Sequence, residues 1–146
     1  MKKLKLIKGE FGTELPLPYA EQGARAGFPS PSQDYIDRSL DFNKDIITHP
    51  SATFYVTVEG DSMTDAGIYD GDLAIVDRSL DPEDGDIVLA WFDDGFTIKY
   101  IDLSLKEKKG KIYLRAANKI YPVFEVNQYD AFSVFGVVIG TVRLFK

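Results

Sequence analysis

A serine and a lysine are the residues of this sequence whose types and surroundings offer covalent chemistry. Ser62 stands in the segment Gly60-Asp61-Ser62-Met63, directly after an expected strand, and Lys99 lies 37 positions later (99 minus 62) in another expected strand. A serine just after a glycine-assisted strand end can project its hydroxyl free of neighbouring side chains, while the next backbone N–H groups face an incoming oxyanion. The segment therefore suits acyl transfer, although Gly-Asp-Ser is also a common surface turn.

A nucleophilic serine needs a base, and histidine is a poor candidate here. The only histidine, His49, precedes Pro50 at an expected helix end, so we interpret it as structural. A lysine can serve instead when burial lowers its pKa from about 10.4 toward neutrality, because desolvation disfavours the ammonium form. Strand alternation puts Lys99 on one face with Thr97 and Ile101, in largely apolar surroundings. An edge lysine that prevents aggregation, or one that reaches solvent along its stem, fits this pattern equally well.

The composition indicates one globular domain with a short appendage. The chain has 146 residues, 45% of them apolar, which is enough for one sizeable core. With no cysteine and one histidine, disulfides and Cys- or His-rich metal centres are excluded, and no cofactor is expected. The sequence has neither an apolar stretch of about 18 residues nor a secretory signal, which predicts a cytoplasmic protein without membrane contact. The net charge of −6 argues against sequence-specific DNA binding and favours a protein partner.

After residue 52 the sequence predicts a mainly β body. Short β-branched and aromatic runs alternate with Gly and Asp, which is typical of consecutive antiparallel strands. Asp93-Asp94-Gly95 predicts a hairpin turn in which Gly95 takes a positive φ, and the lysine run from 106 to 111 predicts an exposed turn. The expected strands cover residues 53–59, 73–77, 87–92, 96–103, 111–116 and 131–145.

The first 33 residues predict an extended, solvated arm. Between Glu10 and Gln33, seven Gly and Pro residues interrupt any regular element of ordinary length, although a well-packed loop of the core is an alternative. We therefore divide the chain into an arm, residues 1–33, and a β domain, residues 34–146. Two short helices are expected at the start of the β domain, one over 33–40 capped by Ser32 and one over 42–48 capped by Asp41.

The segments that carry Ser62 and Lys99 resemble those of the Ser/Lys self-cleaving peptidases of the LexA and UmuD family. Gly60-Asp61-Ser62-Met63 follows a strand and Phe96-Thr97-Ile98-Lys99-Tyr100 lies in a later strand, as in that family. The resemblance implies a peptidase body of coiled antiparallel sheets with short N-terminal helices and an extended N-terminal cleavage arm. It also implies that Ser62 is the nucleophile and Lys99 the general base. Further segments match the UmuD branch in order and spacing: 27–31, 49–53, 70–73, 85–88 and 134–138.

The resemblance also places the scissile bond in the protein's own arm. Ala26-Gly27 is the matching pair, 35 positions before Ser62 (62 minus 27), and its small side chains suit an extended segment entering a narrow cleft. UmuD proteins usually carry cysteine before the glycine, whereas LexA-type repressors carry alanine, as here. A second pair, Ala66-Gly67, stands close to the nucleophile within the expected body and is discounted. By analogy with the family, the backbone N–H of Met63 is the expected oxyanion donor.

The short N-terminal segment favours the UmuD branch of the family. LexA-type repressors carry a helix-turn-helix domain of roughly 60 residues before the arm, and only 26 residues precede Gly27. The resemblance to UmuD implies an SOS mutagenesis protein whose self-cleavage is stimulated by a RecA filament on single-stranded DNA. The trimmed homodimer would serve as accessory subunit of a UmuC-like Y-family translesion polymerase. Residues 1–26 carry five basic and three acidic side chains, so cleavage leaves a body of charge −8 (−6 minus +2).

Other functions remain open on the sequence. A non-catalytic dimeric scaffold or regulator that keeps the LexA-type fold is the main alternative, because a fold can outlast an activity. Type I signal peptidases also use a Ser/Lys pair, but they need a membrane anchor. A carboxylate-pair hydrolase or a calcium site is the weakest alternative, because the aspartates between positions 61 and 86 miss the spacing of an EF-hand loop and their glycine neighbours indicate turns.

Overall fold

The computed structural model of the chain describes residues 6–9, 11–20, 26, 36–127 and 130–146. The chain divides into two compact units, a larger unit of Met1–Gly9 with Ser51–Lys146 and a smaller unit of Glu10–Pro50. The larger unit holds an eight-stranded antiparallel sheet and the smaller unit a two-stranded one. The prediction of a mainly β protein is therefore confirmed.

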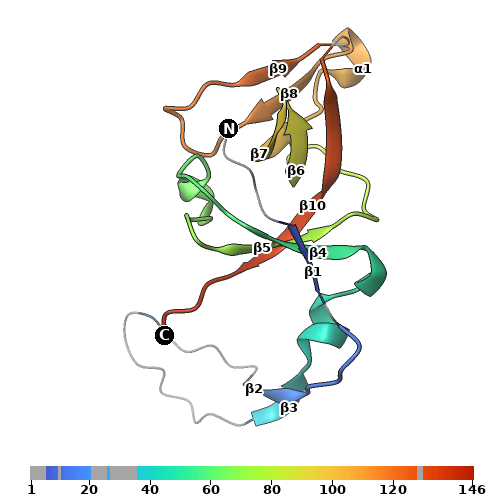
Figure 1. Cartoon of the computed structure of the whole chain (residues 1–146), viewed down its shortest axis with the longest axis vertical. Helices are drawn as coiled ribbons and strands as arrows, with labels where there is room; N and C mark the ends of the chain where they lie inside the picture. The colour runs from blue at the N-terminus through green and yellow to red at the C-terminus, as the bar shows by residue number, and fades with distance from the viewer. Residues whose placement is uncertain (1–5, 10, 21–25, 27–35, 128–129) are drawn as a thin grey trace. The chain divides into compact units, whose positions relative to one another are not determined.

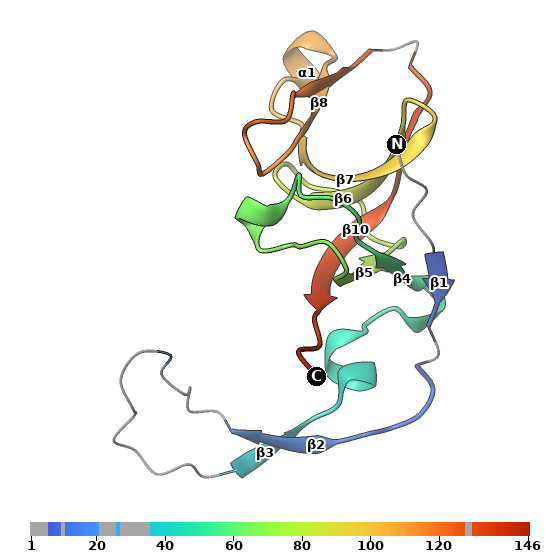
Figure 2. The same cartoon turned by 60° about the vertical axis from the view of Figure 1, so that its left-hand side comes forward.

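The sheet of the larger unit joins strands that are far apart in the chain (Figures 1 and 2). Its strands are β1 (Leu6–Lys8), β4 (Thr53–Thr57), β5 (Leu73–Asp77), β6 (Ile87–Phe92), β7 (Gly95–Asp102), β8 (Ile112–Arg115), β9 (Phe124–Val126) and β10 (Phe132–Val142). Their order is β1-β4-β5-β10-β6-β7-β8-β9, with antiparallel neighbours throughout. The long strand β10 pairs with β5 on one side and with β6 on the other, so it connects the two halves of the sheet.

Two groups of buried apolar side chains stabilise this sheet. One contains Val56 of β4, Val76 of β5 and Leu89 of β6, and the other contains Val88 of β6 and Ile101 of β7. Burying a side chain of this size contributes about 1.5–3 kcal/mol relative to leaving it exposed. Because the neighbours Val88 and Leu89 belong to different groups, both faces of β6 are covered. In β7, one of the two strands that pair with β6, the residues Thr97, Ile98, Lys99 and Ile101 are buried.

The hairpin between β6 and β7 forms where the sequence predicts it, but its turn differs. Asp93 and Asp94 take positive φ values of 52° and 60°, whereas Gly95 is the first residue of β7 and pairs with Phe92. The register therefore leaves a two-residue turn with both central residues left-handed, a conformation that aspartate tolerates better than most residues. The prediction that Gly95 supplies the positive φ is wrong.

The smaller unit pairs two antiparallel strands, β2 (Leu17–Ala20) and β3 (Ile36–Leu40). Pro18 is tolerated in β2 because both strands of a two-stranded sheet are edge strands. The four-residue β2 lies among the prolines, where the sequence predicts no regular element of ordinary length. The helix expected over 33–40 is wrong, because residues 36–40 form β3. A helix of that length is marginal by itself, whereas pairing with β2 satisfies backbone groups of β3.

The second expected helix is confirmed as a single turn. Asp41 accepts a hydrogen bond from the Asn43 amide at 3.0 Å and so caps a five-residue π-helical turn, Phe42–Ile46. The other oxygen of the Asp41 carboxylate accepts from the Leu15 amide at 2.9 Å, which connects the turn to the segment before β2. A 3-10 turn, Pro50–Ala52, leads from there into β4.

Sequence patterns missed the shortest strands. β1, β2 and β9 have three or four residues each, too few for an alternating pattern to be recognised. The six longer strands of the larger unit overlap the predicted ones, with ends that differ by up to three residues. The predicted exposed turn around the lysine run contains a short exposed helix, α1 (Lys106–Lys109).

Candidate active site

The turn that follows β4, drawn in green in Figure 2, carries Ser62. Gly60 takes a φ of 89°, which favours glycine, and its N–H donates to Asp70 Oδ1 at 2.8 Å. The chain then enters a 3-10 turn, Thr64–Ala66, with Met63 as its N-cap. The Met63 side chain is 2% exposed and packs in the core, whereas Ser62 is half-buried. The buried methionine thus anchors the turn while the serine stays accessible.

Lys99, in the middle of β7, directs its amine at this serine. Nζ lies 2.9 Å from Ser62 Oγ, 2.8 Å from Thr97 Oγ1 and 3.1 Å from the carbonyl oxygen of Ile98. A charged lysine donates to all three oxygens. A neutral amine has two N–H donors and one lone pair, so it can donate to Thr97 and Ile98 and accept the proton of the Ser62 hydroxyl. The three contacts therefore suit the basic form of the lysine.

Burial determines how basic Lys99 is. The residue is only 6% exposed, and desolvation lowers its pKa from 10.5 to about 8. At pH 7 about one lysine in ten is then neutral, against about one in three thousand for a pKa of 10.5. Burial therefore raises the concentration of the basic form several hundred-fold near neutral pH.

Replacing Lys99 by methionine is expected to stabilise the protein. Below pH 8, folding places a charged amine in a desolvated site, and the difference between a pKa of 10.5 and one of about 8 corresponds to about 3 kcal/mol. We expect Lys99→Met to raise the free energy of unfolding by up to that amount at pH 6. The gain should shrink between pH 8 and 10.5, where the folded lysine is neutral and the unfolded lysine still charged.

Urea unfolding at several pH values measures this effect, with Lys108→Met as the control. Lys108 lies exposed on α1, so its replacement is expected to change stability by less than about 0.5 kcal/mol. A Lys99→Met protein less stable than wild type at pH 6 would contradict the expectation.

A pocket of about 280 Å³ opens at Ser62 and Lys99. Its lining includes residues of β7 and of the turn that carries Ser62, residues 60–66, which we call the nucleophile turn. It also includes Tyr121, from the segment that leads into β9, and Phe124, the first residue of β9. Within the part of the chain that the structure describes, the Met63 N–H donates no hydrogen bond. The Ser62 hydroxyl, the Lys99 amine and Met63 thus lie at one pocket.

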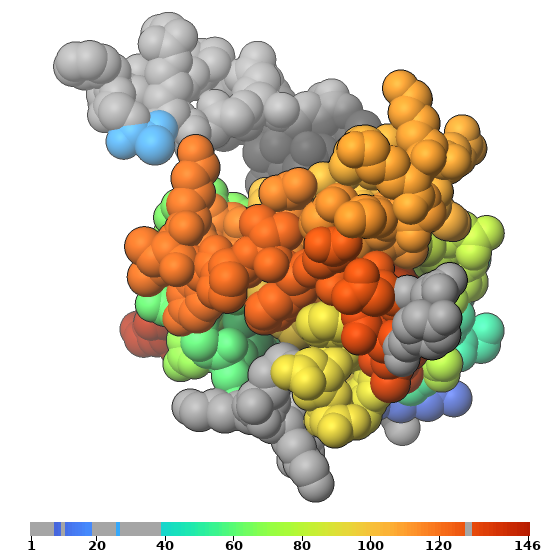
Figure 3. Space-filling view, turned by 90° about the horizontal axis from the view of Figure 1, so that it is seen from above, coloured from blue at the N-terminus to red at the C-terminus, as the bar shows by residue number. Residues whose placement is uncertain are grey.

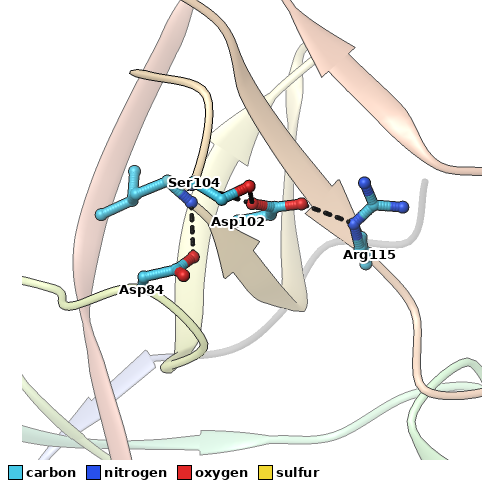
Figure 4. A network of polar contacts seen from close by, with 5 residues as sticks. Asp84, Asp102, Ser104 and Arg115 are labelled. Carbon is cyan, nitrogen blue, oxygen red and sulfur yellow. Dashed lines mark hydrogen bonds and ion pairs between the residues drawn. The ribbon is translucent and has the colours of Figure 1, made fainter. Parts of the chain in front are cut away.

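A polar network anchors the end of β7 against β8 (Figure 4). The Asp102 carboxylate accepts from the Ser104 amide at 2.9 Å, from the Ser104 hydroxyl at 2.6 Å and from Arg115 Nε at 2.9 Å. These hydrogen bonds, with the Ser104 hydroxyl first, lower the pKa of Asp102 to about 2. Asp84 adds a hydrogen bond from the Leu103 amide at 2.7 Å. The strand that carries the lysine is therefore held at its C-terminal end.

The structure brings three of the predicted site residues together: Ser62, Lys99 and Met63 line one pocket. Ala26 is an exposed residue of the smaller unit, and Gly27 lies outside the described residues, so the scissile bond stays a prediction. In the described residues, no group of three or more His, Asp or Glu side chains could hold a metal ion. No helix found there is long and apolar enough to cross a membrane.

Sequence reasoning missed several residues that surround Ser62 and Lys99. Thr97 lies within hydrogen-bond distance of the amine, and strand alternation, which puts it on the face of Lys99, is the signal that could have identified it. Tyr121 comes from the connection between β8 and β9, and Phe124 is the first residue of β9. No local motif around either residue indicates contact with residues 60–63.

An antiparallel β body that holds a serine hydroxyl beside a buried lysine amine is typical of a serine peptidase with a Ser/Lys pair. The family model described as Peptidase S24-like matches residues 18–139. SamA from Salmonella typhimurium is 39% identical over 126 residues, which cover 86% of each protein. ImpA from the same species is 36% identical over 131 residues, covering 86% of this chain and 83% of ImpA. MucA from Escherichia coli is 37% identical over 123 residues, covering 84% of this chain and 81% of MucA.

The chain belongs to the Peptidase S24-like family. This result confirms the predicted membership of the Ser/Lys self-cleaving family and its UmuD-like branch. It also confirms the predicted class of activity, a self-cleaving serine endopeptidase of SOS mutagenesis.

Proposed function

We propose that this chain cleaves itself between Ala26 and Gly27, with Ser62 as nucleophile and Lys99 as general base, and that the trimmed form acts in SOS mutagenesis. The 2.9 Å separation of Lys99 Nζ from Ser62 Oγ, inside a pocket, is the observation that carries the proposal. In this proposal residues 1–33 form the arm with the scissile bond and residues 34–146 the peptidase domain. The test is the appearance of a new N-terminus at Gly27 in the purified protein.

The proposed reaction is acyl transfer through an ester. Neutral Lys99 takes the proton of Ser62 as Oγ attacks the carbonyl carbon of Ala26, and the Met63 N–H donates to the resulting oxyanion. The Lys99 ammonium then gives its proton to the nitrogen of Gly27, and the peptide C–N bond breaks. Water, deprotonated by Lys99, attacks the ester carbonyl, the Lys99 ammonium returns its proton to Ser62 Oγ, and the ester C–O bond breaks. Residues 1–26 then end in a carboxylate and are no longer covalently attached.

Self-cleavage is expected to accelerate as the pH rises through about 8. Only neutral Lys99 can accept a proton, so the rate should rise about tenfold per pH unit below its pKa of about 8 and level off above it. The first-order loss of intact chain, followed by mass spectrometry from about pH 6 to 10 without any partner, measures this profile. A flat profile, or a midpoint near 10.5, would contradict a buried lysine as the base.

The proposed partners rest on the family resemblance. They are a RecA filament on single-stranded DNA that stimulates cleavage, a second copy of the chain in a homodimer, and a UmuC-like Y-family polymerase in the cytoplasm. Neither sequence-specific DNA binding nor membrane contact belongs to the proposal. Charge supports a change of partner once the cleaved fragment leaves, since loss of residues 1–26 takes the net charge from −6 to −8. Equal affinity of intact and trimmed chains for the polymerase would argue against it.

The fragment 1–26 is expected to stay bound after the peptide bond is cut. It contains β1, which pairs with β4, and β2, which pairs with β3, and neither pairing involves the bond at Ala26. Each backbone hydrogen bond contributes about 0.5–1.5 kcal/mol, so release of the fragment should be a separate step. Native mass spectrometry of the cleaved protein should show body and fragment together. A chain that starts at residue 10 lacks β1 and should lose its fragment more readily; equal release from both chains would contradict this expectation.

A further inference from the structure

Asn118, in the segment between β8 and β9, forms two hydrogen bonds with the nucleophile turn. The backbone N–H of Asn118 donates to the carbonyl oxygen of Ser62 at 2.9 Å, and Asn118 Nδ2 donates to the carbonyl oxygen of Asp61 at 3.3 Å. The preceding amide, Ala117 N–H, donates to Met63 Sδ at 3.4 Å. One short stretch therefore contacts three consecutive residues of the turn. Figure 3 shows the orange residues that precede β9 beside green ones on one face of the molecule.

We propose that Asn118 is a positioning residue for self-cleavage, which holds the peptide planes on both sides of Ser62 and so aims the Ser62 hydroxyl and the Met63 N–H. The inference rests on the proposed function, because it concerns the same reaction. Asn118 itself does not touch the reacting atoms. It acts through the backbone of the nucleophile turn.

The geometry of the peptide bond explains how one hydrogen bond directs a donor on the other side. A trans peptide is planar, and its C=O and N–H point in opposite directions. When Asn118 holds the Ser62 carbonyl, the N–H of the same peptide, which belongs to Met63, must point away from Asn118. There it meets no acceptor among the described residues, so it stays available to the oxyanion. If the Ser62–Met63 peptide could rotate freely, the Met63 N–H would no longer point toward the oxyanion.

The peptide before Ser62 is held from two sides. Its carbonyl, that of Asp61, accepts from Asn118 Nδ2 at 3.3 Å and from the Thr64 hydroxyl at 3.0 Å. The Asp61 carboxylate also accepts a hydrogen bond from the Tyr121 hydroxyl. With both flanking planes held, the backbone of Ser62 has little freedom, and the direction of its Cβ and hydroxyl is restricted.

An asparagine suits this position because its side chain has both a donor and an acceptor. While Nδ2 reaches Asp61, Oδ1 accepts from the Ile120 amide at 3.3 Å, and the Asn118 carbonyl accepts from the Tyr121 amide at 3.2 Å. The acceptor, Oδ1, thus stabilises the loop that contains Asn118, and the donor, Nδ2, holds the nucleophile turn at Asp61. Aspartate would keep the acceptor contact with the Ile120 amide and lose the donor contact with the Asp61 carbonyl. Asn118→Asp therefore separates the two roles.

The rate of self-cleavage tests the inference through Asn118→Ala and Asn118→Asp, with Lys119→Ala as control. Lys119 is the exposed neighbour of Asn118 on the same loop, so the rate of self-cleavage of Lys119→Ala should lie within about twofold of the wild-type rate. Both variants keep the backbone N–H of Asn118 and lose the contact of Nδ2 with the Asp61 carbonyl, and Asn118→Ala also loses Oδ1, whose contact with the Ile120 amide helps to place that backbone N–H. Misaligned catalytic groups commonly cost about a hundredfold, so we expect both Asn118 variants to be about 10–100-fold slower at pH 9. The midpoint of the pH profile should stay near 8, because the surroundings of the Lys99 amine are unchanged. Rates within about threefold of wild type, or a loss of rate with a shifted midpoint, would overturn the inference.

A second measurement does not depend on cleavage. Backbone ¹⁵N relaxation at pH 6, where the charged lysine keeps the chain intact, should show lower order parameters for the Ser62 and Met63 amides in the Asn118 variants but not in Lys119→Ala. Unchanged order parameters would overturn the positioning role. If the wild-type protein does not cleave itself but the Ser62 and Met63 amides become more mobile in the Asn118 variants, the proposed function is contradicted, whereas the positioning of the turn by Asn118 is supported.

Discussion

Replacing Ser62 or Lys99 by alanine is expected to abolish self-cleavage, with a loss in rate of about 10⁴-fold or more. The two side chains act as one unit, 2.9 Å apart, so removing either one removes the activated nucleophile. Wild-type protein incubated at about pH 9 should yield the fragment 1–26 and a body that begins at Gly27. Intact-mass measurement and N-terminal sequencing identify both products.

Two controls show that the loss is specific. Ser133 is an exposed serine of β10 and Lys108 an exposed lysine of α1, so Ser133→Ala and Lys108→Ala should cleave like wild type. Product formed at the wild-type rate by Ser62→Ala would show that another nucleophile cuts the chain. A folded wild-type protein that yields no product at any pH would favour the non-catalytic scaffold.

Arg143→Ala is expected to lower the free energy of unfolding by about 2–3 kcal/mol. The Asp72 carboxylate is 1% exposed, and Arg143 Nε and Nη2 donate to its two oxygens at 2.6 and 2.8 Å. The Arg143 hydrogen bonds hold the pKa of Asp72 below its ordinary value. Truncation leaves a buried, unpaired carboxylate, which costs about 3–5 kcal/mol in a fully buried pair, and the 38% exposure of the Arg143 side chain reduces that loss.

Urea unfolding in a Ser62→Ala background, which keeps the chain intact, measures this loss. Arg115→Ala is the matched control, because the Arg115–Asp102 pair is more exposed and should contribute less than about 1 kcal/mol. The contribution of Asp72 is present at neutral pH and is lost as the pH falls through its lowered pKa, so the difference between wild type and Arg143→Ala should shrink in acid. Equal losses in the two arginine variants would contradict the prediction.

The Asp72–Arg143 pair also lies beside the nucleophile turn. Arg143 Nη2 also donates to the Gly67 carbonyl at 3.0 Å, and Gly67 caps the 3-10 turn Thr64–Ala66 that follows Ser62. The Asp72–Arg143 pair therefore stabilises the chain just after the 3-10 turn. The segment before β9 contacts the chain just before that turn, at Asp61 and Ser62. Both supports come from parts of the chain far from Ser62 in sequence.

The sequence already identified the longer strands and the chemistry of the site. Lys99 stands out in β7 because a charged residue inside an apolar strand is costly unless it has a role, and Gly60, two residues before Ser62, indicates a sharp turn. The helix expected over 33–40 failed because local patterns of that length do not decide between a helix and a paired strand. Strand β9 and the contacts of Asn118 had no local signal at all.

Residue types and their alternation along β7 by themselves determined which groups can react and on which strand face the lysine lies. Only the tertiary structure decided that the groups meet. Three strands, β5, β10 and β6, separate β4 from β7 in the sheet, and a flat sheet would keep β4 and β7 about 19 Å apart, at about 4.8 Å per strand. Ser62 lies five residues beyond Thr57, the last residue of β4, so the chain after β4 and the twist of the sheet together bring Lys99 Nζ to 2.9 Å from Ser62 Oγ. That curvature is a sum over the packing of every strand, and no local stretch of sequence encodes it.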